Sequence, residues 1–377
     1  MTRLKAAIAG VGTTDYGRMP DHDAYDLGMW ALTNALDDAG LGFADIDAIL
    51  VNRIPDYQRF CEIAGIDPQL VNITPGHGRY SGILIDTAVS LVMSGRHEVV
   101  ALVYGNNGRS AGVAYGGADD SYGSGGGAIW FPYGMTSPGA FHAMMMRRHM
   151  ELYGTKPEQL AEVPIAFRKH ASLNPQAVMR ERFDLEGYLN ARMIAEPLRL
   201  LDYCLINDGG VAIIVTTPER ARDLRKPPVY VRGSALQTAF AESTFPPDDF
   251  WAGPLGSVRE RSFGDAGLSH DDMNALMIYD NFSATVLFSL EGLGYCGVGE
   301  SGGFVEGGTL QLGNRFPTNT SGGHLSESYM QGWALNVEAV RQLRGECGER
   351  QVKDATNIHY AAASPVCASI VYSRDPS

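Results

Sequence analysis

Two stretches of the chain repeat one another: residues 38–51 read DAGLGFADIDAILV, and residues 265–278 read DAGLSHDDMNALMI. They align without a gap at an offset of 265 − 38 = 227 residues, and both open with Asp, Ala, Gly and Leu. In each copy the pattern predicts a helix that ends at glycine, then a turn, then a buried apolar strand. A repeat of this length in register indicates a duplicated α/β unit.

The segments that follow the two copies also correspond. In the first half SGILIDTAVSLVMSG (81–95) predicts a helix and HEVVALVYG (97–105) a strand. In the second half YMQGWALNVEAVRQLRG (329–345) predicts a helix and DATNIHYAAAS (354–364) a strand. Strands that alternate with helices are typical of parallel βαβ units with helices on both faces of the sheet.

An insertion separates the last strand of the first half from the rest of that half. Residues 105–140 are rich in glycine, and residues 141–200 predict helices. Insertions of this kind often cover a binding site. We therefore predict a first half over residues 1–225, with an inserted loop region at about 105–200, and a second half over 226–377.

Composition and charge narrow the classes of protein. The chain has 377 residues, of which 45% are hydrophobic, so it can bury a large core. Its net charge of −13 argues against nucleic acid as a partner, because phosphate binding needs a basic surface. Between residues 147 and 199 basic side chains outnumber acidic ones, nine to seven, which fits an anion-binding region or an ordinary helical surface.

Location is predicted from what the sequence lacks. No apolar run is long enough for a membrane span, and the first residues lack the apolar segment of a signal peptide. The five cysteines are scattered, without C-x-x-C spacing. We expect a reduced cytoplasmic protein without a cysteine-based zinc site.

Three further segments carry a resemblance to a known family: LDYCLINDGGVAIIVTTPERA (201–221), LEGLGYCGVGE (290–300) and NTSGG (319–323). Together with the duplication they resemble the thiolase superfamily, in its sterol-carrier-protein-type (lipid-transfer) branch. The resemblance covers essentially the whole chain. It implies a five-layer α/β sandwich of two βαβαβαββ halves, with the loop region inserted in the first half, and a homodimer.

Thiolases use two cysteines, the histidine of a Gly-His-Pro motif and an Asn-Glu-Ala-Phe loop, and this chain departs from that pattern. The nucleophilic cysteine aligns with Arg79, and the second with Ala361–Ala363, where no cysteine occurs. Cys367 lies nearby but is best explained as a small core residue. The family's histidine aligns with Tyr329 and its asparagine with Tyr279.

Loss of both cysteines removes the carrier of an acyl-enzyme thioester. Retro-aldol cleavage needs no nucleophile, only a proton shuttle and donors to an enolate oxygen. The chain is similar to the thiolase-like retro-aldolases of steroid side-chain breakdown. That resemblance implies cleavage of a β-hydroxyacyl-CoA to a ring ketone and propionyl-CoA. It also implies a partner, the small OB-fold and zinc-ribbon domain of a companion acyl-CoA hydratase, so that any zinc belongs to the partner and this chain has no cofactor.

We predict that Tyr279 and Tyr329 form the catalytic pair, with Asn281 orienting the substrate and His324 serving as a relay. The alternative for each is a core residue with satisfied polar atoms. Two other functions stay open. One is a divergent acyltransferase with Ser81 or Cys61 as nucleophile, and the other is a non-catalytic scaffold subunit.

Overall fold

One nine-stranded sheet runs through the molecule. The computed structural model describes residues 6–74, 80–113, 130–135, 137–241, 251–363 and 366–376. In these residues the strand order of the large sheet is β3-β2-β4-β7-β1-β8-β11-β10-β9, and β5 and β6 form a separate pair. The strands are β1 Ala6–Thr13, β2 Ala48–Asn52, β3 Leu70–Thr74, β4 Val99–Asn106, β5 Met193–Ala195, β6 Leu198–Arg199, β7 Gly209–Thr216, β8 Val229–Thr238, β9 Ala275–Ile278, β10 Asn357–Ala362 and β11 Val366–Ser373.

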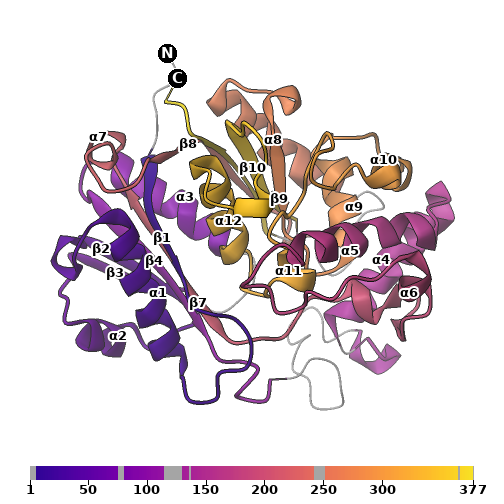
Figure 1. Ribbon diagram of the computed structural model, residues 1–377, viewed down its shortest axis with the longest axis horizontal. Helices are drawn as coiled ribbons and strands as arrows, with labels where there is room; N and C mark the ends of the chain where they lie inside the picture. The colour runs from indigo at the N-terminus through magenta and orange to yellow at the C-terminus, as the bar shows by residue number, and fades with distance from the viewer. Residues whose placement is uncertain are drawn as a thin grey trace.

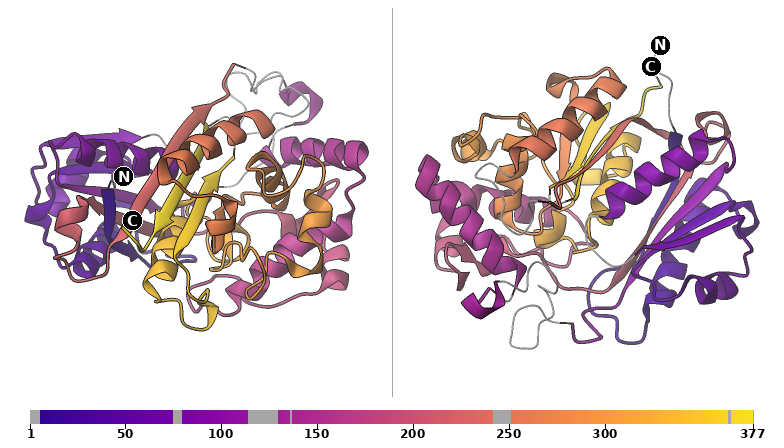
Figure 2. Two further views of the ribbon diagram at one scale, coloured as in Figure 1. Left: turned by 90° about the horizontal axis from the view of Figure 1, so that it is seen from above. Right: turned by 180° about the vertical axis from the view of Figure 1, so that it is seen from behind.

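Helices cover the sheet in layers (Figures 1 and 2). Helices α3 and α12 contact strands of both halves and form the central layer, α1 covers the outer face of the first half, and α8 covers that of the second. The five-layer sandwich is therefore confirmed. The α-helices are α1 Ala24–Ala39, α2 Tyr57–Ala64, α3 Tyr80–Met93, α4 Pro138–Tyr153, α5 Pro157–Ala171, α6 Leu185–Leu189, α7 Pro218–Ala221, α8 Ala252–Ala266, α9 Ser283–Gly292, α10 Ser301–Val305, α11 Gly323–Ser326 and α12 Trp333–Arg344.

The duplication is visible in the topology. The order β2-β4-β7-β1 in the first half recurs as β9-β10-β11-β8 in the second, when each is read from its edge of the sheet toward the centre. Helices α1 and α8 both end at a left-handed glycine, Gly40 (φ 75°) and Gly267 (φ 66°). The two halves meet where β1 pairs with β8 over only three residues.

The sheet is mixed, which differs from the parallel βαβ units expected from the sequence. Strand β2 is parallel to both β3 and β4, and β9 is parallel to β10. Strands β7 and β11, however, are antiparallel to both of their neighbours. Strand β11 follows β10 directly, so the chain returns in the opposite direction, whereas β7 follows β4 only after the inserted helices. The division at residues 225 and 226 stays a prediction.

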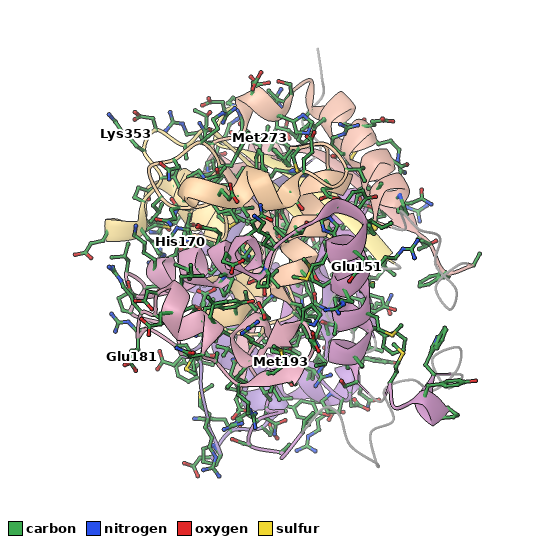
Figure 3. All side chains as sticks on the ribbon, turned by 90° about the vertical axis from the view of Figure 1, so that its right-hand side faces the viewer. Glu151, His170, Glu181, Met193, Met273 and Lys353 are labelled. Carbon is green, nitrogen blue, oxygen red and sulfur yellow. The ribbon has the colours of Figure 1, made fainter. Side chains whose placement is uncertain are left out.

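The inserted region forms helices α4, α5 and α6 beside the second half (Figure 1). Helix α5 packs against α9, α10 and α11, so the insertion contacts the elements that follow β9. Figure 3 faces this side of the molecule and shows Glu151 on α4, His170 on α5 and Met193 on β5. In the part of the chain that the structure describes, no helix is both long and apolar enough to cross a membrane.

Candidate active site

Tyr279 follows directly on the end of strand β9. Its backbone N–H donates to Ala361 O at 2.9 Å, which extends the β9–β10 ladder by one residue. Its side chain is 1% exposed. The corresponding position of the first half, 227 residues earlier, is Asn52, which accepts a hydrogen bond from the Trp333 indole at 3.1 Å. The two copies therefore place different chemistry at the same point of the fold.

Tyr329 lies on the loop between α11 and α12, and the NTSGG turn shapes that loop. The Asn319 side chain bonds both backbone groups of Ile278 at 2.8 Å, so the turn is fixed to the end of β9. Gly323 has φ 61°, and a Cβ there would clash with the Asp280 carboxylate. Asp280 in turn accepts the N–H groups of His324 and Leu325 at the start of α11. Glycine at this position lets the loop approach β9 closely.

The two phenols meet. Tyr279 and Tyr329 share a hydrogen bond of 2.9 Å between their hydroxyl oxygens. Their ring centroids are 6.5 Å apart, and the ring planes are inclined at 70°. Tyr329 is half-buried, whereas Tyr279 is buried. The structure thus brings together the two residues that the sequence predicted as a pair, and their catalytic role stays a prediction.

His324 lies beside both phenols but bonds elsewhere. Its ring centroid is 4.7 Å from that of Tyr279 and 5.2 Å from that of Tyr329. Nε2 accepts the Gly332 N–H at 2.8 Å, so the proton must be on Nδ1, which lies 3.0 Å from an Asp280 carboxylate oxygen. Both ring nitrogens are thereby occupied, and the imidazole is fully buried. This geometry suits positioning of the loop better than contact with substrate.

Asn281 is turned toward the inserted region. Its side-chain oxygen accepts from Thr285 at 2.8 Å, and its amide nitrogen lies 3.3 Å from Nε2 of His142 on α4. His142 Nδ1 lies 2.8 Å from Pro138 O, so that nitrogen carries the proton and Nε2 accepts from Asn281. Asn281 therefore joins the end of β9 to the insertion. Its predicted role in substrate binding stays a prediction.

The nucleophile positions hold no available thiol or activated hydroxyl among the described residues. Ser81 is fully buried and its hydroxyl pairs with that of Tyr360 at 2.9 Å. Burial raises the pKa of Tyr360 to about 12, so this phenol is a poor base. Cys61 lies on α2, and burial followed by Asp67 raises its pKa. Cys367 is a buried residue of β11, as predicted. Arg79 lies outside the described residues.

Asn207 holds the backbone of Tyr329 and was missed by sequence reasoning. Its side-chain oxygen accepts the Tyr329 N–H at 2.7 Å, and its own carbonyl accepts from Asn106 at 3.1 Å. Asn106 also accepts from the Arg53 guanidinium at 3.0 Å. These residues come from three separate segments of the first half. In the sequence this place was marked only by the segment 201–221, which carries the family resemblance and contains Asn207.

Buried charged residues also support the loop between α11 and α12. Glu327 accepts from Ser321 at 2.6 Å and from Asn174 at 3.1 Å. Burial, followed by repulsion from Glu338, raises the pKa of Glu327 to about 7. Burial also acts to raise the pKa of Glu338, but its ion pair with Arg350 outweighs this and leaves the pKa lowered. A carboxyl group that changes charge near neutral pH therefore lies two residues from Tyr329.

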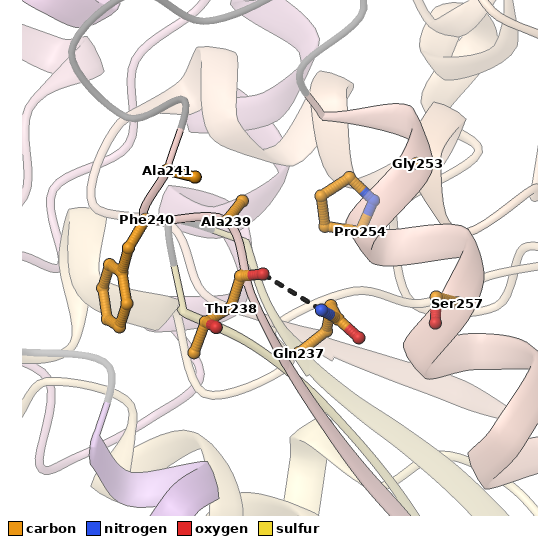
Figure 4. Close-up of a pocket in the computed structure, with 8 residues that line it drawn as sticks. All are labelled: Gln237, Thr238, Ala239, Phe240, Ala241, Gly253, Pro254 and Ser257. Atoms are coloured by element: carbon orange, nitrogen blue, oxygen red, sulfur yellow. Dashed lines mark hydrogen bonds between the residues drawn. The ribbon is translucent and has the colours of Figure 1, made fainter.

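Two hollows open near the ends of the strands. The smaller has an empty volume of about 270 Å³, including its mouth, and Tyr329, Asn207 and Gln331 line it. The larger, about 810 Å³, lies between the end of β8 and the start of α8 and is lined mainly by small and apolar residues, among them Phe240 and Pro254 (Figure 4). Residues 242–250, which follow Ala241 in the sequence, are outside the described part. Within the described ranges, no group of three or more His, Cys, Asp or Glu residues is placed to hold a metal ion.

Comparison with known proteins gives consistent matches over the whole chain. A family model for the thiolase C-terminal domain matches residues 246–367. The chain is 35% identical to a steroid side-chain-cleaving aldolase of Thermomonospora curvata, over 97% of this chain and 96% of that protein. It is 34% identical to a 17-hydroxy-3-oxo-4-pregnene-20-carboxyl-CoA lyase of Mycobacterium tuberculosis, over 90% and 92%. A solved structure described as the Ltp2-ChsH2(DUF35) aldolase is similar with a TM-score of 0.90 and 32% identity, over 99% of this chain and 98% of that one.

Proposed function

The chain belongs to the thiolase superfamily, within its branch of steroid side-chain-cleaving aldolases, and from this premise we propose that it cleaves a steroid β-hydroxyacyl-CoA by a retro-aldol reaction. It is a carbon–carbon lyase that acts on acyl-CoA. The proposal extends to the products, a ring ketone and propionyl-CoA. The observation that carries the proposed mechanism is the 2.9 Å hydrogen bond between the Tyr279 and Tyr329 hydroxyls.

The reaction is a transfer of protons around one bond cleavage. A base takes the proton of the β-hydroxyl, the oxygen forms the ketone, and the electrons of the α–β bond pass into the thioester as an enolate. An acid then returns a proton to the α carbon, so no atom is gained or lost. The protein must therefore accept one proton, donate one proton and stabilise negative charge on the thioester oxygen.

A pair of hydrogen-bonded phenols suits this sequence of steps. When one phenol loses its proton, the other can donate a hydrogen bond to the phenolate and stabilise its charge. Tyr279 is buried and fixed by the β-ladder, while Tyr329 is half-buried and faces the smaller hollow. We propose that the pair exchanges the substrate proton and binds the thioester oxygen, with His324 and Asp280 holding the loop in place. Asn281 is proposed to help orient the substrate from the side of the insertion.

We also propose that the chain works with a companion protein. The similar solved structure is described as the Ltp2-ChsH2(DUF35) aldolase, and the two joined names support a companion. For this chain we propose the OB-fold and zinc-ribbon domain of a companion acyl-CoA hydratase, with zinc held by that domain and no cofactor in this chain. We further propose a homodimer of this chain. Mixing the purified proteins and measuring the mass of the assembly by light scattering tests both associations.

The decisive experiment is product analysis with phenol variants. A steroid β-hydroxyacyl-CoA is supplied with and without the partner, and the ring ketone and propionyl-CoA are quantified. Tyr279→Phe and Tyr329→Phe are each expected to lower kcat by at least about 100-fold, because acid–base catalysis contributes about 10²–10⁴-fold. Tyr372→Phe is the matched control, since it removes a buried phenolic oxygen bonded to Asn336, outside the pair. Turnover by both pair variants at the rate of the control rules out tyrosine catalysis.

The same assay separates the other functions. A covalent acyl-enzyme detected by mass spectrometry after mixing with acyl-CoA would support the acyltransferase. The Ser81–Tyr360 pair argues against it, because a phenol with a raised pKa does not activate a serine. Stable binding of the partner without turnover of any β-hydroxyacyl-CoA would support the scaffold.

A further inference from the structure

Gln331 carries a buried acceptor that no described residue satisfies. The side chain is 5% exposed, and its carbonyl oxygen Oε1 is buried without a hydrogen-bond partner. Buried polar atoms are nearly always paired, because an unpaired one loses its bonds to water and gains nothing in return. An unpaired acceptor on a residue that lines a hollow points to a ligand that brings a donor.

The hollow is the smaller one, beside the phenol pair. Gln331 lines it together with Tyr329, Asn207, Asn106 and Arg53. The empty volume of about 270 Å³ counts its open mouth, and the enclosed space is about 10 Å³, roughly what one water molecule needs. The hollow therefore admits one small polar group of a larger substrate and excludes a fused ring system.

The walls of the hollow are held in place by their backbone. Arg53 (φ 66°) and Gln331 (φ 52°) are two of the four non-glycine residues with positive φ in the described part of the chain. Such conformations persist only where the surroundings enforce them, and they are common at binding sites. Here Asn207 holds the N–H of Tyr329, and His324 holds that of Gly332, on either side of Gln331. The acceptor is thus pre-positioned two residues from a phenol of the pair.

The chemistry of the walls selects the class of ligand group. Oε1 of Gln331 needs a donor, while the Arg53 guanidinium on the same wall offers N–H groups and therefore suits an acceptor. A hydroxyl or a secondary amide carries a donor and an acceptor together and matches both. A carboxylate or phosphate has no donor at neutral pH and would repel the carbonyl oxygen.

We propose that Gln331 is a substrate-binding and specificity residue whose side-chain carbonyl accepts a hydrogen bond from a neutral donor of the acyl-CoA thioester. This inference rests on the proposed function, because it assumes that a thioester lies at the phenol pair. Two groups of such a substrate carry a neutral donor: the β-hydroxyl, which would bond Gln331 only until the base takes its single proton, and the pantetheine amide nearest to the sulfur. Each group offers Gln331 a neutral hydrogen-bond donor, and the experiment below distinguishes the two.

The test uses Gln331→Met in the full chain with its partner, because methionine keeps the length and removes the acceptor. Four compounds are compared: the β-hydroxyacyl-CoA, the acyl-CoA without the hydroxyl, and the N-acetylcysteamine and methyl thioesters of the hydroxylated acid. Affinity is measured by calorimetry, and kcat/KM is measured where cleavage occurs. We expect losses of about 10- to 100-fold for every compound that carries the recognised donor and none for those that lack it.

The pattern of losses identifies the donor. If it is the β-hydroxyl, only the hydroxyl-free acyl-CoA is unaffected by the substitution. If it is the amide, only the methyl thioester is unaffected. A variant that handles all four compounds as the wild type does overturns the proposal. Wild-type protein that binds these compounds but cleaves none contradicts the proposed function, yet the affinities still decide the role of Gln331.

Stability measurements guard against a folding artefact. Since no described residue bonds Oε1 of Gln331, Gln331→Met is expected to leave the melting temperature unchanged or raised. Gln342→Met is the matched control, because the Gln342 amide bonds Thr320, Glu338 and the Arg350 carbonyl and its loss should lower the melting temperature. Gln331→Glu keeps an acceptor and should recover at least tenfold of the lost affinity. Failure to recover any affinity, with a normal melting temperature, contradicts the acceptor role.

Discussion

Glu327→Gln should make the protein more resistant to unfolding at alkaline pH. Glu327 accepts from Ser321 and Asn174, and burial followed by repulsion from Glu338 raises its pKa from 4.5 to about 7. A glutamine imitates the protonated acid: its oxygen accepts from Asn174 and its amide donates to Ser321 Oγ. The substitution therefore removes a group that must be ionised against its surroundings above neutral pH.

The sign and size of the expected change in unfolding free energy follow from the raised pKa of Glu327. A carboxyl group whose pKa is higher in the folded state stabilises that state below pH 4.5, and this contribution is lost as pH rises through about 7. At about 1.36 kcal/mol per pH unit, the wild type loses roughly 2.5 kcal/mol from this group between about pH 5 and pH 8.5. The variant has no such loss. The difference in unfolding free energy, variant minus wild type, should thus rise by roughly 2.5 kcal/mol over that interval.

Both proteins are unfolded with urea at several pH values, and the unfolding free energy of the wild type is subtracted from that of the variant. The contributions of the other titrating groups cancel in this difference. Glu291→Gln is a control of opposite sign. Burial raises the pKa of Glu291, but bonds from His149 and Ser301 outweigh this and leave it lowered. That variant should be the less stable protein at neutral pH, and the deficit should shrink on acidification. A pH-independent difference for Glu327→Gln would refute the argument that this carboxyl resists ionisation.

Three further substitutions test the support of the phenol pair. Asn207→Ala leaves the Tyr329 N–H without its acceptor, which should lower the unfolding free energy by about 1–3 kcal/mol. In steady-state assays kcat should fall at least tenfold, and an unchanged kcat contradicts the positioning role. Gly332→Ala should lower the unfolding free energy by about 1–3 kcal/mol, because φ is 87° and a Cβ would lie 2.5 Å from Ser81 Oγ; an unaltered thermal midpoint argues against the close approach. His324→Leu removes the partner of the buried Asp280 carboxylate and should lower the unfolding free energy by about 3–5 kcal/mol. A smaller loss of unfolding free energy in urea means that water replaces the imidazole.

Most of the architecture was predictable because local sequence patterns determine it. The repeat at residues 38–51 and 265–278 gave two helix–glycine–strand units, and both appear, with left-handed Gly40 and Gly267 at the helix ends. The direction of β7 and β11 was not predictable from periodicity. An apolar run such as VAIIV reads identically in a parallel and an antiparallel strand, and only the pairing partners decide.

The candidate site was predictable only in part. Alignment with the thiolase pattern identified Tyr279 and Tyr329, and the structure places their hydroxyls within hydrogen-bond distance. Asn207 and Gln331 had no comparable signal. Asn207 acts 122 residues away in the chain, and Gln331 attracts notice only because its oxygen lacks a partner. Contacts of that kind depend on tertiary packing, which composition and spacing do not report.

Helix α12 begins at Trp333, and the indole of this residue donates a hydrogen bond to Asn52. Asn52 occupies the position in the first copy that Tyr279 occupies in the second. The two copies are thereby no longer interchangeable: the second carries a phenol of the proposed pair, and the first carries the amide that anchors Trp333. A gene cut between the copies would yield two fragments, and we expect the second, which carries both phenols, not to hold them together until the first reassembles with it.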